Sequence, residues 1–293
     1  MGTHESRAIR SRGAVADGHE RTQTWQGSSV FTQVAVLTRR AVLNYLSDPR
    51  AVVLGLMPPI IILFLMASAF SKLNSHTPGI PPGVSYFQFV LPAVLVNCAI
   101  NASVQTGAAL VDELRSGVTA RLRSLPILPS SILIASSFSG LIRTAVQAVI
   151  LLVLAQLTHG NVSLGGLAGM VASVGLTLLM GWFLGWVFLM AGIWIRRADA
   201  MLSLAFLASL PLMFVSSAYI PVSDLPTVLA AVAHVNPVTY AINAERALFL
   251  KTAGRTVGAG VILPPIVISL VLGTATAYAA VRLFRRPLQA SRQ

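Results

Sequence analysis

The chain has 293 residues, of which 55% are hydrophobic and 10% are charged, and its formal net charge at pH 7 is +12. A water-soluble protein carries about 25% charged residues, so this composition excludes an ordinary soluble enzyme and predicts a membrane protein. The basic residues stand beside apolar runs, as the positive-inside rule requires, so the net charge does not indicate nucleic-acid binding. The single cysteine, Cys98, excludes an intrachain disulfide.

The first elements in chain order are a polar N-terminus and an amphipathic helix. Residues 1–27 lack the apolar stretch of a signal peptide, and we predict that they are disordered. Residues 30–46 have one apolar and one polar face, which predicts an interfacial helix on the membrane surface. The apolar face holds Val30, Val34, Leu37, Ala41 and Tyr45, opposite Gln33, Arg39, Arg40 and Asn44. The candidate interfacial residues are Arg39, Arg40, Tyr45, Asp48 and Arg50. The alternative is a helix that packs on protein.

Six apolar stretches approach or exceed the roughly 20 residues that a spanning helix needs. They are predicted at about 51–70, 86–110, 136–158, 168–194, 200–219 and 258–281. Residues 28–286 therefore form one six-span domain, followed by a cytoplasmic tail over 287–293. Arg143 interrupts the third span, and we expect it near the cytoplasmic boundary with its side chain reaching the headgroups. Two GxxxG pairs, at 165–169 and 181–185, favour close helix packing.

The positions of lysine and arginine predict the orientation of the chain. Of the 21 such residues, Lys72, Arg246, Lys251 and Arg255 lie on one predicted side and Arg143 lies in a span, which leaves 16 on the other side. Because cytoplasmic loops carry the excess of basic residues, both termini are predicted to face the cytoplasm.

Several function classes lack their motifs in this sequence. Acids such as Asp112 and Glu245 fall at the edges of the predicted spans or in loops, so the intramembrane carboxylate of a proton- or sodium-driven carrier is missing. The five histidines are scattered and no hydrolase motif occurs, so we predict neither a catalytic nor a metal site. A P-loop is also absent, so the chain cannot hydrolyse ATP alone.

The segment after the second span, residues 112–133, has a pattern of its own. Leucines and valines recur at helical spacing between basic residues, and Pro126 ends the pattern. The predicted short cytoplasmic helix either docks in the groove of a partner protein or lies on the headgroups, and composition does not separate the two. Its candidate residues are Leu114, Arg115, Gly117, Val118, Thr119, Arg121, Leu122, Arg123 and Pro126.

Residues 216–257, between the fifth and sixth spans, hold apolar segments too short to cross the bilayer. Prolines and an Asn-Pro pair break them apart, which predicts short re-entrant or surface helices on the extracellular side. They either line an exit gate or form a cap with only a packing role. The candidate gate residues are Ser216, Ser217, Tyr219, Pro221, Pro226, Asn236, Pro237 and Tyr240.

Six short motifs, in this order, resemble one known family. They are LSDPR at 46–50, the loop 117–126 ending in RLRSLP, PLMFVSSAYIP at 211–221, LP at 225–226, NPVTY at 236–240 and AERAL at 244–248. On a six-span chain they resemble the permease subunits of ABC-2 type exporters, in particular the daunorubicin-resistance group, over roughly residues 30–286. One departure is Ala120, where many members have an acidic residue.

The resemblance implies a fold, partners and a mechanism. It implies an all-α membrane protein in which two permease subunits, identical or related, pair over two copies of a separate ABC ATP-binding subunit. ATP and Mg would bind to those subunits, and this chain would bind no cofactor. The helix after the second span would couple the subunits, with Leu114, Val118 and Leu122 in the partner's groove, and residues 216–240 would shape the outer gate.

The resemblance also implies a cargo and a location. A hydrophobic drug or lipid would pass between the subunits, mainly along spans one, two and five, in contact with membrane lipids. Arginine outnumbers lysine 19 to 2, which favours a bacterial source and the plasma membrane. The rival functions are export of a polysaccharide or other polymer within the same superfamily, and a non-transporting membrane scaffold or immunity protein.

Overall fold

The computed structural model describes residues 29–70, 80, 83–116, 129–160, 163–250 and 258–285. All regular structure in these ranges is helical, and five helices are long and apolar enough to cross a membrane. They are α2 (Pro49–Ala69), α3 (Tyr86–Arg115), α5 (Pro129–His159), α6 (Gly166–Ile195) and α10 (Ala259–Arg285). The shorter elements are α1 (Val30–Ser47), α7 (Ala198–Phe214), the 3₁₀ turn η2 (Val222–Asp224), α8 (Thr227–Val235) and α9 (Pro237–Phe249). The predicted all-α membrane fold is confirmed.

The fifth predicted span, 200–219, is too long at its outer end. The corresponding helix α7 has 17 residues and ends at Phe214. The chain turns there because the side-chain amide of Asn236 bonds the carbonyls of Leu212 and Val215, which a longer helix would use itself. Since α7 is shorter than the five long helices, the count of six spans stays a prediction.

The helices of the second and third predicted spans extend beyond the predicted apolar stretches, α3 at its C-terminal end and α5 at its N-terminal end. Helix α3 continues to Arg115 and α5 begins at Pro129, so both extend beyond the apolar stretches at 86–110 and 136–158. No proline or glycine interrupts α3 between Ala108 and Ser116, and the helix therefore continues into its charged last turns.

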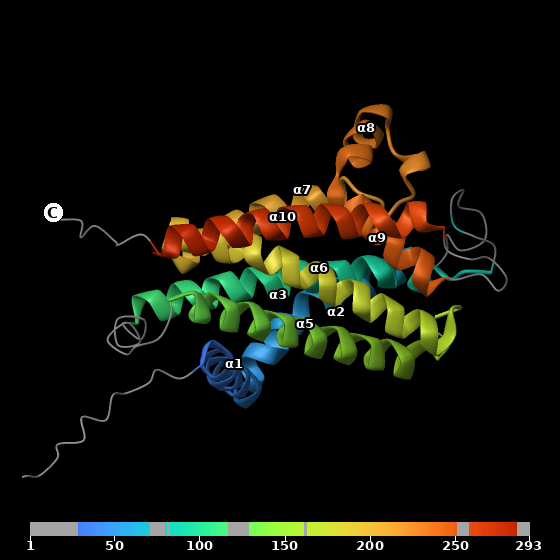
Figure 1. The fold of residues 1–293 in the computed structure, drawn as a ribbon. Coiled ribbons are helices and arrows are strands. Elements are labelled where there is room, and N and C mark those ends of the chain that lie inside the picture. The colour runs from blue at the N-terminus through green and yellow to red at the C-terminus, as the bar shows by residue number, and fades with distance from the viewer. Residues whose placement is uncertain are drawn as a thin grey trace, which may run out of the picture.

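Helix α3 forms the centre of the bundle. It packs against α2, α5, α6, α7 and α9, and most of its side chains are buried. In Figure 1, α3, α5, α6 and α10 run alongside one another. The core includes the fully buried Leu91 and Leu95 of α3 and Leu151 of α5.

Glycines allow the helices of this bundle to approach one another closely. A Cβ atom on Gly181 would lie 3.0 Å from the Thr144 side chain of α5, and one on Gly169 would lie 2.7 Å from the carbonyl oxygen of Leu248 in α9. Members of both predicted GxxxG pairs therefore act inside the chain. By contrast, no atom lies within 4 Å of a Cβ built on Gly185.

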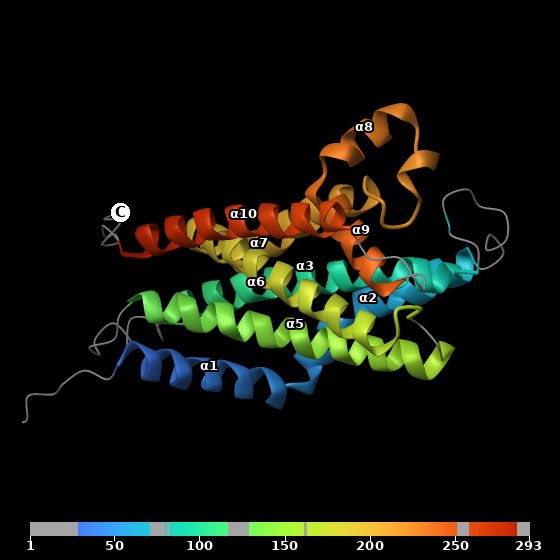
Figure 2. The same cartoon turned by 45° about the vertical axis from the view of Figure 1, so that its right-hand side comes forward.

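Helix α1 packs on α5. Figure 2 shows it running beside α5 at the edge of the bundle. Four of the five residues predicted for its apolar face turn toward the protein, namely Val34, Leu37, Ala41 and Tyr45. The prediction is wrong for Val30, which is exposed, and for Gln33, which is buried because its side-chain oxygen accepts a hydrogen bond from Ser131 of α5 at 3.0 Å.

Tyr45 and Arg143 join α1 to the third span. The Arg143 guanidinium lies 4.6 Å from the centre of the Tyr45 ring, a cation–π contact, and the arginine side chain is half-buried. The expected place of Arg143 near the cytoplasmic boundary, with its side chain reaching the headgroups, stays a prediction.

The described chain begins and ends at the same end of the bundle. Figure 2 shows the start of α1 and the last turn of α10 at one end, with α8 and α9 at the other. The described basic residues of α1, of the last turn of α3 and of the α6–α7 junction all belong to the first end. This gathering of positive charge is the pattern that the predicted orientation requires.

Candidate functional site

The candidate site lies at the end of the bundle where α7, α9 and the start of α3 meet. Helix α9 begins there at Pro237, whose missing N–H group costs nothing in the first turn of a helix. The preceding residue, Asn236, is the N-cap of α9. We call this region the outer junction and define it by Ser216, Ser217, Asn236, Asn243 and Arg246.

Asn236 holds two helix ends together. Its Nδ2 atom donates to the carbonyl oxygens of Leu212 at 2.6 Å and Val215 at 2.8 Å, at the end of α7. Its Oδ1 atom accepts from the backbone N–H of Val238 at 3.0 Å, in the first turn of α9. One buried side chain therefore satisfies backbone groups that both helices leave unpaired.

Serines and a tyrosine order the turn after α7. The Ser216 hydroxyl donates to the carbonyl of Met213 at 2.6 Å, and the Ser217 hydroxyl donates to Oδ1 of Asn243 in α9 at 2.8 Å. The Tyr86 hydroxyl of α3 donates to the carbonyl of Tyr219 at 2.9 Å. The structure thus brings Ser216, Ser217 and the backbone of Tyr219 into one network with α9 and α3.

Arg246 of α9 links the same turn to α3. Its Nε atom donates to the carbonyl of Phe89 at 3.2 Å, and Nη2 donates to the carbonyls of Ser217 at 2.8 Å and Ala218 at 3.5 Å. The guanidinium also lies 3.7 Å from the centre of the Phe89 ring. In the sequence, Arg246 is one of four basic residues on the predicted outer side and part of the motif at 244–248, and neither feature predicts these contacts.

Glu245 turns the opposite way, into α6. The side chain is fully buried, and its two carboxyl oxygens accept from the hydroxyls of Ser173 and of Thr177, the latter at 2.7 Å. Burial raises the pKa of the Glu245 carboxyl to about 8, although the two hydroxyl hydrogen bonds lower it. The sequence predicts Glu245 outside the six spans, among short re-entrant or surface helices, and does not predict that α9 folds back and buries this side chain against α6. A clue in the sequence is the spacing of Ser173 and Thr177, which puts both hydroxyls on one face of α6.

The other predicted gate residues form a separate arm. Pro221 and Pro226 precede η2 and α8, and Figure 2 shows α8 projecting from the bundle. Tyr240 connects this arm to α9, since its hydroxyl donates to the carbonyl of His234 at 2.7 Å. The predicted gate therefore divides into the outer junction and a projecting arm.

Most of the predicted coupling helix, residues 117–126, lies outside the described residues. Leu114 and Arg115 belong to the last turn of α3 and not to a separate helix. Leu114 packs on an apolar cluster that includes Ile132 of α5, and Leu37 of α1 packs on the same cluster. Leu114 thus makes a contact inside the chain, and its entry into a partner's groove stays a prediction. Among the residues that the structure describes, no three His, Cys, Asp or Glu side chains form a group that could hold a metal ion.

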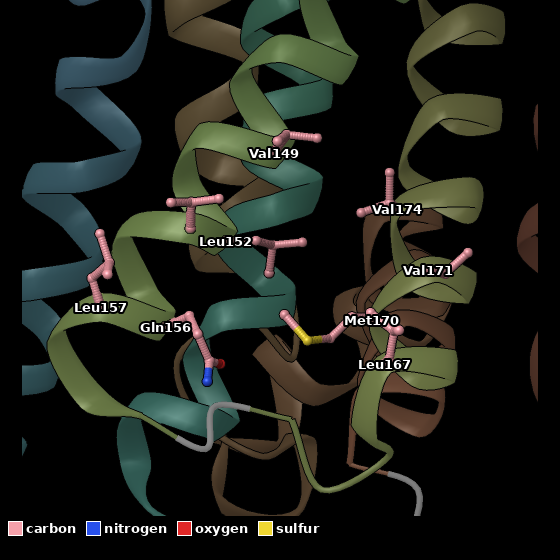
Figure 3. Close-up of a pocket in the computed structure, with 9 residues that line it drawn as sticks. Val149, Leu152, Gln156, Leu157, Leu167, Met170, Val171 and Val174 are labelled. Carbon is pink, nitrogen blue, oxygen red and sulfur yellow. The ribbon is translucent and has the colours of Figure 1, made fainter.

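An apolar groove of about 410 Å³ runs between α5 and α6 near the outer end (Figure 3). It is lined by Val149, Leu152, Val153, Gln156, Leu157, Leu167, Met170, Val171 and Val174. Figure 3 shows Met170 reaching from α6 into the space between the helices, and Gln156 is the one polar residue of this lining. Such a surface suits a hydrocarbon chain. It lies between the third and fourth spans, apart from the route along spans one, two and five that the family resemblance implies.

A smaller apolar cavity lies behind the outer junction. Its volume is about 140 Å³, and its lining comes from α3, α6, α7, α9 and α10. Pro237 and Val238 of α9 form part of the wall beside Leu212 of α7. A displacement of α9 would therefore change the shape of this cavity.

Replacing Asn236 separates its two roles. Asn236→Asp keeps the acceptor for Val238 but loses both donors and sets a carboxylate against the carbonyls of Leu212 and Val215. We expect it to lower the free energy of unfolding by about 2–4 kcal/mol, close to the loss in Asn236→Ala. Unfolding of both variants in mild detergent measures the difference. An Asn236→Asp protein as stable as the unmodified chain would show that only the cap of α9 matters.

The sequence and fold place the chain in a known family. Residues 32–250 match the ABC-2 type transporter family, so this chain is a member, a multi-pass membrane permease of a kind that works with an ATP-binding subunit. It is 28% identical over 202 residues to the daunorubicin resistance ABC transporter permease protein DrrB1 of Streptomyces coeruleorubidus, with 68% of each chain covered. It is 25% identical over 230 residues to the putative transport permease ycf38 of Porphyra purpurea, with 76% of each covered, and 22% identical over 218 residues to that of Cyanophora paradoxa, with 74% covered. The resemblance seen in the sequence is confirmed.

Proposed function

We propose that this chain is the membrane subunit of an ATP-driven exporter that moves a hydrophobic drug or lipid-like compound out across the bacterial plasma membrane. Two permease subunits, identical or related, pair on two ATP-binding subunits, with both termini of each permease in the cytoplasm. ATP and Mg bind to the partner subunits. The observation that carries the proposal is an ABC-2 permease domain over residues 32–250 in a chain without a P-loop.

The apolar surfaces of the bundle support a hydrophobic cargo. The groove between α5 and α6 and the cavity behind the outer junction both have mainly apolar linings, whereas a polymer exporter needs a wider polar passage. The relative from Streptomyces coeruleorubidus is named for daunorubicin resistance, which agrees with a drug as cargo. On this proposal the outer junction and the arm of α8 control the exit.

The first experiment is an affinity purification of this chain from its native membrane in mild detergent, followed by mass spectrometry. A P-loop ATPase recovered in equal ratio supports the exporter, and vesicles containing both subunits should then show ATP-dependent efflux of a fluorescent phospholipid or of daunorubicin. The chain purified by itself should show no ATPase activity above background. Repeated recovery of the chain alone would favour a non-transporting scaffold.

Leu122→Asp tests the coupling helix after α3. A charge placed in the apolar groove of the ATP-binding subunit is expected to reduce ATP-dependent efflux by about tenfold or more, because desolvating an unpaired carboxylate costs several kcal/mol. Insertion should be unaffected, since the residue lies outside the predicted spans. Leu122→Met is the matched control and should transport normally. Normal efflux by well-expressed Leu122→Asp protein would contradict docking.

A further inference from the structure

The outer end of the bundle contains a carboxyl group that the exporter mechanism does not use. Glu245 is fully buried and lies against Ser173 and Thr177, which are one helical turn apart on α6. Each hydroxyl donates to a different oxygen of the carboxyl group. The three side chains therefore form a closed contact between α9 and α6.

No cation compensates Glu245 within the described part of the chain. Helix α9 packs against α3, α6 and α10. Along α6 there is no charged residue, and along α10 the titratable side chains are Tyr278, Arg282 and Arg285 at the opposite end. The titratable groups of α3 before its charged last turns are Tyr86, bonded to the Tyr219 carbonyl, and the buried Cys98.

The titratable neighbours on α9 itself point elsewhere. Arg246 donates hydrogen bonds to the carbonyls of Phe89 and Ser217. The Tyr240 hydroxyl donates to the His234 carbonyl. An ionised Glu245 would thus keep a buried negative charge on two hydroxyl hydrogen bonds alone. The neutral acid is the better occupant of this position, because it carries no charge and its O–H can still donate to one of the hydroxyls.

We propose that Glu245, Ser173 and Thr177 form a proton-binding site that fixes α9 to α6 while the proton is bound and releases α9 when the proton leaves. The bond that breaks is the carboxyl O–H, and the proton passes to water at the outer surface, leaving a carboxylate that is stable only when hydrated. Because α9 anchors the outer junction, the site makes that junction responsive to external pH. Its consequence for export rests on the proposed function, but the site itself does not.

The upward shift of the Glu245 pKa sets the direction in which the docking of α9 depends on pH. The pKa of Glu245 is raised to about 8 from an ordinary value of 4.5, so the folded protein holds a proton that the unfolded chain releases between these values. The contribution of the neutral acid to the docking of α9 is therefore complete below about pH 4.5 and is lost as the pH rises through 8.

A cysteine reporter in α9 measures this docking. Ala241 is fully buried, so Ala241→Cys in a Cys98→Ala background reacts with a maleimide only when α9 leaves the bundle. The purified full-length chain in nanodiscs is labelled between pH 6 and 9.5, with and without Glu245→Gln, which imitates the neutral acid. We divide the labelling rate of the protein with Glu245 by the rate of the Glu245→Gln protein at the same pH. This ratio removes the pH dependence of the thiol itself.

We expect this ratio to rise roughly tenfold between pH 7 and pH 9, as for a group that titrates near pH 8. Parallel profiles in the two proteins would overturn the proposal. If Glu245→Gln does not fold, the Thr177→Val variant provides the test of the proton site. Loss of a donor to the carboxylate should move the transition of the labelling rate to higher pH, whereas Thr274→Val, whose hydroxyl bonds only its own helix, should leave it in place. An unmoved transition in Thr177→Val would also overturn the site.

Since the assay contains neither ATP nor cargo, its result is independent of whether the chain exports anything. A pH-dependent release of α9 without ATP-driven efflux would leave the proton site standing and remove the exporter. ATP-driven efflux together with a docking of α9 that does not depend on pH would support the exporter and remove the proton site.

Discussion

Arg246→Met is expected to lower the free energy of unfolding by about 2–3 kcal/mol and to abolish export in the reconstituted system. The guanidinium supplies hydrogen bonds to the carbonyls of Phe89, Ser217 and Ala218, and the last two lie in a turn. Methionine fills the same space but donates nothing, and each buried carbonyl left unpaired costs about 1–3 kcal/mol. The cation–π contact with Phe89 is lost as well. Chemical unfolding in detergent and vesicle efflux measure the two effects.

Arg282 of α10 provides the matched control. It also lies over an aromatic ring, 4.9 Å from the centre of Tyr278, but its side chain is exposed. Arg282→Met should therefore change the stability by less than about 1 kcal/mol. Equal losses in the two variants would mean that the charge itself matters and the carbonyls of the turn do not. Arg246→Lys should recover only part of the loss, because one ammonium group cannot reproduce the planar fork.

The fold class and the main helices could be predicted because they depend on composition and length. Long apolar stretches have one stable solution in lipid, a helix whose backbone groups bond within the segment. The apolar face of α1 followed from its spacing for the same reason. Gln33 was misplaced because its burial depends on Ser131, a partner 98 residues away, which periodicity does not reveal.

The outer junction was located by its prolines and by Asn236, but its chemistry was not predictable. Turn residues mark where a helix stops, and they do so from local sequence. The carboxyl of Glu245 and the guanidinium of Arg246 acquire their roles only when α9 folds back between α3 and α6. Adjacent residues on a helix face different directions, so these neighbours of opposite charge serve separate contacts.

Helix α3 connects the two regions that the proposed mechanism requires to act together. At one end Tyr86 bonds the turn after α7, and at the other end Leu114 packs on the cluster that also receives Leu37 of α1. On the proposed mechanism, this helix of 30 residues would carry a displacement from the segment that follows Arg115 to the outer junction. This transmission depends on close packing of α3 against its neighbours along its length.

Gly107→Ala is expected to disrupt that packing more than any surface change of the same size. A Cβ atom at this position would lie 2.5 Å from the carbonyl oxygen of Phe188 in α6 and 2.2 Å from the Met201 side chain. The methionine can move, but the backbone of α6 cannot without separating the two helices. Overpacking of this kind costs about 1–3 kcal/mol, more than the roughly 1 kcal/mol that alanine gains over glycine in a helix.

Gly175→Ala in α6 tests the same substitution where space is open, since no atom lies within 4 Å of its added Cβ. It should leave the free energy of unfolding unchanged or raise it by up to about 1 kcal/mol. Gly107→Ala is expected to lower it instead. Unfolding in detergent measures both. A Gly107→Ala protein at least as stable as the unmodified chain would show that α3 and α6 are free to separate, and α3 would then be a poor carrier of motion between the two ends.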